Sequence, residues 1–188
     1  MINIFKIFLK STAVCLLTVV LFSCSNTSKS ARDFLADKNL PVGTAKNIYH
    51  IYKDSGYITS KLISNRMLDF SNRKEHPYNE FPDGIKIVNF ENKGLDSVTI
   101  TGNYAITYAK TSVSEIRGNV IVKNHSDLSM LTTEQLFWDQ KTNYFVSEKP
   151  FCLTKENDTI FGVGFESKGD LSEHLAKKIT GKLETTEE

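Results

Sequence analysis

The sequence lacks the features of a nucleic-acid-binding or metal-binding protein. Its 188 residues carry 23 Lys plus Arg against 22 Asp plus Glu, and no basic stripe offers charge to neutralise a row of phosphates. The cysteines are Cys15, Cys24 and Cys152, and neither they nor the four histidines show a paired ligand spacing. We therefore expect no nucleic-acid partner, no structural metal and no cofactor.

The sequence also lacks a recognisable catalytic motif. No G-x-S-x-G occurs, and the Gly162-Val163-Gly164 fragment lacks the third glycine of a phosphate-binding loop, because Ser167 stands in its place. Glu134 and Asp139 flank Trp138 and form the one carboxylate pair that a glycan hydrolase would use. The alternative interpretation is a solvated strand residue and a turn residue. We favour this alternative and expect a protein that is not an enzyme.

No apolar run is long enough to be an obvious membrane span. The uncharged run at residues 11–22 has 12 residues, whereas a helix that crosses the hydrocarbon core needs about 20. Lys6 and Lys10 precede this run, as in a signal sequence. The run ends in Leu21-Phe22-Ser23-Cys24, which resembles a bacterial lipobox. We predict a leader at residues 1–23 and acylation of Cys24, and an uncleaved N-terminal anchor is the alternative.

Removal of the leader leaves a nearly neutral chain, with 21 basic and 22 acidic side chains. Overall charge would not hold such a chain to a membrane, whereas a lipid would. Cys152, between Phe151 and Leu153, would be the only free thiol, and we interpret it as a small buried apolar residue. Residues 25–33 are polar and predict a flexible tether within a linking region at 24–44, before a domain at 45–188.

The domain is predicted to be all-β. Residues 98–108 read as one strand with Val98, Ile100, Tyr104 and Ile106 on one face, and residues 116–123 alternate in the same way. The other predicted strands are at 47–53, 57–63, 85–90, 133–138, 144–147, 151–154, 159–165 and 179–183. We expect an irregular loop at 71–80 and a helical turn that begins at Asp170. Regular spacing of short strands indicates a sandwich, barrel or jelly roll.

Five segments of the chain resemble one known family. They are FPDGI at 81–85, ITGNYA at 100–105, RGNV at 117–120, LTTEQLFWD at 131–139 and IFGVGFES at 160–167. In these segments and their order the chain resembles LptC-type periplasmic proteins of lipopolysaccharide export, in the lipoprotein form of Bacteroidetes-like bacteria. Gly102-Asn103, where the family pattern has Ala-Asp, and Cys152 are departures from that pattern.

The resemblance implies a twisted, incompletely closed antiparallel β-jelly roll with a hydrophobic groove. The groove would receive the acyl chains of lipopolysaccharide from the jelly-roll domain of an inner-membrane ABC transporter, which docks at the early strands (47–63). It would pass them to a periplasmic bridge protein of similar fold at the late strands (161–183). Handover at both ends suits exposed strand edges, which accept a partner strand. The location implied is the periplasmic face of the inner membrane.

Alternation and the matched segments together predict the residues that line the groove. They are Val120, Val122, Leu136, Trp138, Phe151, Leu153 and Phe165. Leu136 and Trp138 share a parity that Leu131 does not, which predicts a bulge between them. The alternative function is a lipid-anchored β-sandwich that binds another apolar ligand or scaffolds an envelope assembly.

Overall fold

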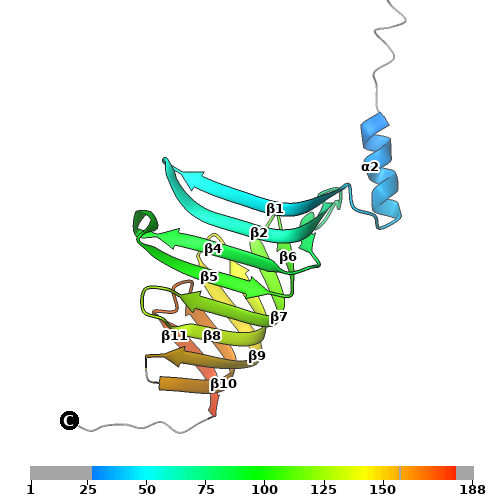
Figure 1. The fold of residues 1–188 in the computed structure, drawn as a ribbon. Coiled ribbons are helices and arrows are strands. Elements are labelled where there is room, and N and C mark those ends of the chain that lie inside the picture. Colours follow the sequence, from blue (N-terminus) through cyan, green and yellow to red (C-terminus); the bar gives the residue numbers. More distant parts are fainter. Residues whose placement is uncertain (1–26, 157, 181–188) are drawn as a thin grey trace, which may run out of the picture.

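The computed structural model describes residues 27–156 and 158–180, which form one helix, a 3-10 turn and eleven strands. Figure 1 shows the strands stacked from β1 at one end to β10 and β11 at the other. In chain order the elements are α2 (Thr27–Asp37), β1 (Gly43–Asp54), β2 (Tyr57–Phe70), β3 (Tyr78–Phe81), β4 (Ile85–Glu91), η1 (Asn92–Gly94), β5 (Asp96–Gly102), β6 (Tyr104–Tyr108), β7 (Val113–Asn124), β8 (Met130–Asp139), β9 (Tyr144–Lys155), β10 (Asp158–Lys168) and β11 (His174–Thr180).

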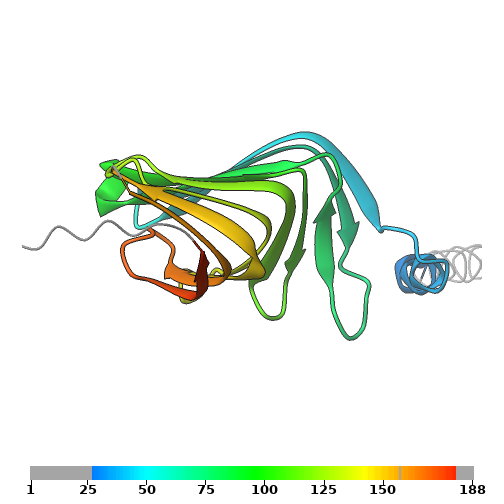
Figure 2. The same ribbon diagram turned by 90° about the horizontal axis from the view of Figure 1, so that it is seen from below.

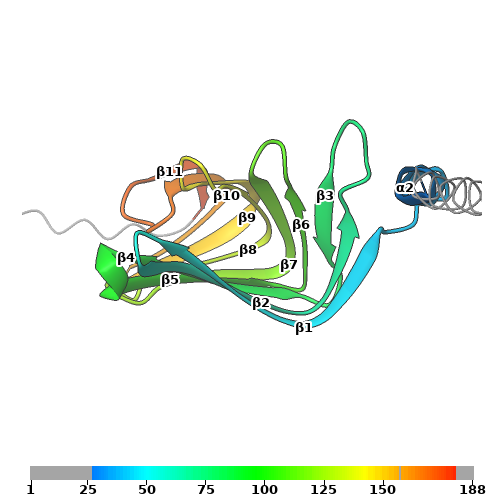
Figure 3. The same ribbon diagram turned by 90° about the horizontal axis from the view of Figure 1, so that it is seen from above.

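All the strand pairings are antiparallel, and the sheet folds over into two layers. β2 pairs with β4 through residues 60–63 and with β3 through residues 68–70. β7 likewise pairs with β6 through residues 113–117 and with β5 through residues 121–124. The long strands therefore cross a corner from one layer to the other, as Figures 2 and 3 show. Within the described ranges β1 pairs with β2 alone and β11 with β10 alone, which confirms the expected jelly roll that does not close into a barrel.

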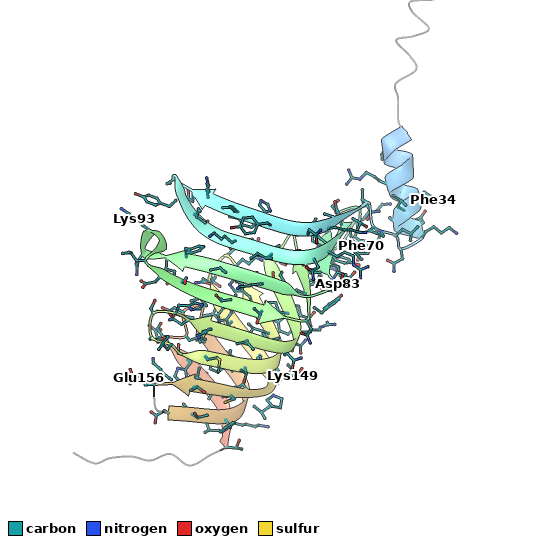
Figure 4. The ribbon with its side chains drawn as sticks, viewed as in Figure 1. Phe34, Phe70, Asp83, Lys93, Lys149 and Glu156 are labelled. Carbon is teal, nitrogen blue, oxygen red and sulfur yellow. The ribbon has the colours of Figure 1, made fainter. Side chains whose placement is uncertain are left out.

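Bulges and glycines make the corner. Register shifts, which bend a strand locally, occur at residues 117–120 of β7, 133–137 of β8 and 163–165 of β10. Gly118, Asn119 and Gly164 have positive φ at these points. Figure 4 helps to locate the corner: Lys149, which lies at the corner in β9, is on the same side of the molecule as Asp83, and Lys93 and Glu156 are on the opposite side. The shift in β8 confirms the bulge predicted between Leu131 and Leu136.

The prediction of one strand at residues 98–108 was wrong. The chain breaks at Asn103, whose backbone N–H donates to the carbonyls of Arg117 and Gly118 at 3.1 and 2.9 Å. The inward parity changes there, because Ala105 is fully buried whereas Tyr104 and Ile106 are half-buried. β5 thus belongs to one layer and β6 to the other, and a single alternating pattern does not carry across the corner.

Three further predictions differ from the structure. Residues 144–147 and 151–154 belong to one strand, β9, which passes through the corner at Lys149 and Pro150. The predicted loop at 71–80 contains the start of β3. At residues 170–173 there is no helical turn: Asp170 Oδ1 accepts the backbone N–H and hydroxyl of Ser172, and β11 begins at His174. The predicted end of the last strand at 183 lies outside the described residues.

The segment before the sheet is a helix instead of the expected flexible tether. α2 covers residues 27–37, and side chains of the turn between β2 and β3 hydrogen-bond to the helix and to residues that follow it. Asn72 Nδ2 donates to the Arg32 carbonyl at 2.9 Å, and Arg73 Nη2 donates to Asn39 Oδ1 at 2.8 Å. Among the described residues, no helix is long and apolar enough to cross a membrane. The predicted leader and Cys24 lie outside these residues.

The core lies between the two layers. Its fully buried side chains include Phe145, Phe165 and Leu171, the last of which comes from the β10–β11 loop. Cys152 was expected to be buried, but it is half-buried on the outer face, where it pairs with Thr132 and Phe161. The reason is alternation, because Phe151 and Leu153 on either side of it point into the core.

Candidate functional site

A groove of about 690 Å³ lies between the two layers at the β1 end of the sheet. Its volume is within the range of about 300–1,000 Å³ typical of ligand pockets. Six strands (β1, β2, β3, β4, β6 and β8) and the β8–β9 turn contribute its walls. The lining residues are Ala45, Ile48, His50, Tyr52, Thr59, Ser60, Leu62, Met67, Asn79, Phe81, Ile87, Asn89, Phe90, Glu91, Thr107, Trp138, Gln140 and Asn143.

The walls of the groove are mostly apolar and aromatic. His50 and Tyr52, two residues apart on β1, point to the same side and stack with ring centroids 4.2 Å apart. Leu62 and Met67 of β2 are partly buried and pack against the core. Walls of this kind suit an apolar ligand, because each Å² of apolar surface removed from water contributes about 25 cal/mol of favourable free energy.

Hydrogen bonds connect three of the side chains that line the groove. Trp138 Nε1 donates to Asn143 Oδ1 at 3.1 Å, and Asn143 Nδ2 donates to Glu91 Oε1 at 3.3 Å. Asn143 thereby connects the β8–β9 turn in one layer to β4 in the other. Burial raises the pKa of Glu91, and the nearby carboxylates of Asp170 and Asp96 raise it further, against the lowering effect of the Asn143 hydrogen bond.

The groove and the core divide the interior between the layers into two halves. We call the inward faces of β7–β10 the packed half and the groove walls on β1, β2, β3, β4 and β6 the open half. Phe81, Ile87 and Trp138 belong both to the core cluster and to the groove lining, so they form the boundary between the halves. A ligand in the open half would contact this boundary.

The seven residues predicted to line the groove all lie together in the core cluster. Trp138 also reaches the groove, whereas the other six are at most 4% exposed and are absent from its lining. Sequence reasoning missed Ile48, Leu62 and Met67 as groove residues. Alternation in 47–63 was a usable signal for the first two, but it does not say which strands enclose empty space.

The residues considered for catalysis have structural roles. Asp139 Oδ1 accepts the backbone N–H of Lys141 at 2.9 Å, and this hydrogen bond is the main reason why the Asp139 pKa is lowered. Glu134 is exposed and accepts the Asn119 N–H at 3.4 Å in the corner. At Gly162 a Cβ would meet the Phe151 ring at 2.7 Å, so close strand packing explains this glycine.

The fold and the site together define an incompletely closed antiparallel β-jelly roll with a mostly apolar groove between its layers. Residues 12–183 match the family model described as lipopolysaccharide-assembly, LptC-related. The chain belongs to this LptC-related family, a non-enzymatic transport component that acts in lipopolysaccharide transport and assembly in the periplasmic envelope. A comparison with curated proteins found no match to the chain.

Proposed function

We propose that the open half receives the acyl chains of lipopolysaccharide from the jelly-roll domain of an inner-membrane ABC transporter and passes them to a periplasmic bridge protein. The supporting observation is the uncovered groove of about 690 Å³, which has apolar walls next to the free edge of β1. An acyl chain of a dozen methylenes would cost about 10 kcal/mol to expose to water, at about 0.8 kcal/mol each. A covered path is therefore needed throughout the transfer.

The two free edges support the two handovers. In the part of the chain that the structure describes, β1 is unpaired on one side at the groove end of the sheet, and β11 is unpaired at the other end. Unpaired strand edges accept a further strand through backbone hydrogen bonds. We assign β1 and β2 to the transporter and β10 and β11 to the bridge protein. We further propose a leader at 1–23, a lipid on Cys24 and a jelly-roll domain at 45–188.

Two tyrosines on β1 give a matched test of the groove. Tyr52 lines the groove, whereas Tyr49 is 59% exposed and lies outside the groove lining. We expect a photoreactive phenylalanine at Tyr52 to form lipopolysaccharide adducts in cells only while the transporter ATPase is active, and the same residue at Tyr49 to form few. Equal adducts at both sites, or none at Tyr52 in a folded and abundant protein, would contradict the proposal.

Edge contacts are tested by the same chemistry. A photoreactive residue at Ile51 of β1 should crosslink to the transporter, and one at Leu175 of β11 should crosslink to the bridge protein. Lys123, in the middle of the sheet on β7, is the control and should give neither product. Partner adducts of equal yield at Lys123 would show that the edges are not the docking sites. Incorporation of a labelled fatty acid that Cys24→Ala abolishes would establish the anchor.

A further inference from the structure

Four basic side chains gather where α2 meets the turn between β2 and β3. They line a hollow of about 320 Å³ that contains one acidic side chain, so positive charge is in excess by three. The lining residues are Lys29, Arg32, Asp33, Ser71, Asn72, Arg73 and Lys74. Local charge therefore departs strongly from the near-neutral balance of the whole chain.

Within this cluster, Arg73 is held in place by neutral partners. Arg73 donates to the Ala36 carbonyl at 3.4 Å and to Asn39 Oδ1 at 2.8 Å, and its guanidinium lies 4.9 Å from the Phe70 ring centroid. The salt bridges found among the described residues involve none of the four cations. Asp33 lines the same hollow, but among the described residues no carboxylate forms a salt bridge with any of the four, so their charges remain available to an anionic surface.

The position of the cluster in the chain indicates which surface that is. α2 begins at Thr27, and the apolar run of the sequence ends at Phe22. Five residues span at most about 18 Å even when fully extended. If the apolar run or Cys24 is held in a bilayer, the start of α2 lies close to the headgroups. The electrostatic attraction of basic side chains acts over a Debye length of about 8–10 Å there.

We propose that Lys29, Arg32, Arg73 and Lys74 bind the phosphate-bearing headgroups of an anionic phospholipid bilayer. This contact orients the jelly roll, because α2 lies at the β1 end of the sheet, where the groove opens (Figure 1). Overall charge does not attract the chain to a membrane, whereas this one hollow does. The inference rests on the membrane attachment proposed above for the N-terminal segment, but it does not require lipopolysaccharide transfer.

Lysine footprinting on the full chain in vesicles tests the contact. The chain is reconstituted through its N-terminal segment into vesicles of phosphatidylcholine alone or with about 30% phosphatidylglycerol. Acetylation of Lys29 and Lys74 is compared with that of the exposed Lys123 and Lys149 on β7 and β9. We expect Lys29 and Lys74 to react at least about fivefold more slowly in the anionic vesicles, which corresponds to about 1 kcal/mol per basic residue.

Salt should abolish this protection, because the Debye length falls to about 3 Å at about 1 M. Equal protection in both kinds of vesicle, or none in either, would overturn the proposal. Arg32→Glu should also remove the protection of Lys29 and Lys74, since the Arg32 side chain lines the hollow and only its carbonyl contacts Asn72. Lys141→Glu, which makes the same charge change on the β8–β9 turn, is the matched control and should leave the protection intact.

The two proposals fail separately. Lysine protection that is lost while Tyr52 still forms lipopolysaccharide adducts would remove the membrane contact alone. Protection that persists while Tyr52 forms no adducts would remove the proposed transport groove alone. An effect of Lys141→Glu as large as that of Arg32→Glu would show that total charge, and not the hollow, controls the contact.

Discussion

The packed half and the open half of the jelly roll use inward-facing apolar side chains differently. In the packed half Leu136, Phe145 and Phe165 are fully buried, and the β10–β11 loop adds Leu171 between the layers. In the open half Ile48, Leu62 and Met67 line a groove of about 690 Å³ that no side chain of the described residues fills. Both halves are built from the same alternating strands. The difference shows that an inward apolar side chain stabilises the fold only where the facing layer lies close enough to cover it.

The largest expected difference between the two halves is in the free energy of unfolding that is lost when a leucine of each half is replaced by alanine. We expect Leu136→Ala to lower the free energy of unfolding by about 2–5 kcal/mol, because it leaves a cavity in close-packed surroundings. Leu62→Ala should cost about 1 kcal/mol or less, since Leu62 already borders open space. Urea unfolding followed by the fluorescence of Trp138 measures both. Similar losses for the two variants would mean that the groove is ordinary core.

Two glycines test whether the packed half depends on close strand approach. Gly162→Ala on β10 should cost about 1–3 kcal/mol, because the added methyl group would meet the Phe151 ring and the Lys178 carbonyl. Hydrogen exchange of β11 should become faster in this variant. Gly43→Ala at the start of β1, where nothing lies within 4 Å, should be neutral or slightly stabilising. Comparable destabilisation by Gly43→Ala would contradict this account.

Asn143 tests the boundary between the two halves. Asn143→Ala removes the hydrogen bonds with Trp138 and Glu91 and should lower the free energy of unfolding by about 1–2 kcal/mol. Asn119→Ala is the control, because Asn119 has a similar positive φ, 48° against 50°, in an exposed bulge. The difference between the variants reports the side-chain hydrogen bonds. If the two losses are equal, backbone strain alone explains the effect.

The smallest expected effect is the contribution of Glu91 to the pH dependence of the free energy of unfolding. The pKa of Glu91 in the folded state is raised above the ordinary value of 4.5. At pH values between the unfolded-state and folded-state pKa values, the folded protein therefore binds more protons than the unfolded chain. Stability therefore falls as the pH rises through this window, and Glu91→Gln should remove that part of the fall. Asp139, whose pKa is lowered, makes the opposite contribution, and Asp139→Asn should weaken stability above its unfolded pKa. Chemical unfolding at a series of pH values measures both.

Alternation predicted most of the strands because most of them bury one face, although β1 and β11 at the two ends of the sheet contain no fully buried residue. In β7 it placed Ile116, Val120 and Val122 inward correctly. Alternation failed at Asn103 and at Pro150, where the chain crosses the corner. The bend at Asn103 ends one strand and begins another, whereas β9 continues through the bend at Pro150, and the alternating pattern does not distinguish the two cases. The deciding contacts, such as Asn103 with the β7 bulge, join residues that are distant in sequence.

For the candidate site, Trp138 was predicted and Ile48, Leu62 and Met67 were not. A buried strand residue and a groove-lining residue have the same sequence pattern, because both are apolar residues that alternate with polar ones. The helix at residues 27–37 was also missed, since its polar composition favours a linker and it is held by hydrogen bonds from Asn72 and Arg73, about 40 residues away.

The sequence by itself determined an all-β domain, its inward residues, the bulge in β8 and the resemblance to the LptC-type family, because periodicity and short motifs are local properties. Tertiary structure alone decided which inward residues pack and which face empty space, where the strands turn the corner, and that α2 brings four cations together. Those properties depend on the distance between the layers and on contacts between remote residues, and no local pattern in a chain encodes a distance across its own interior.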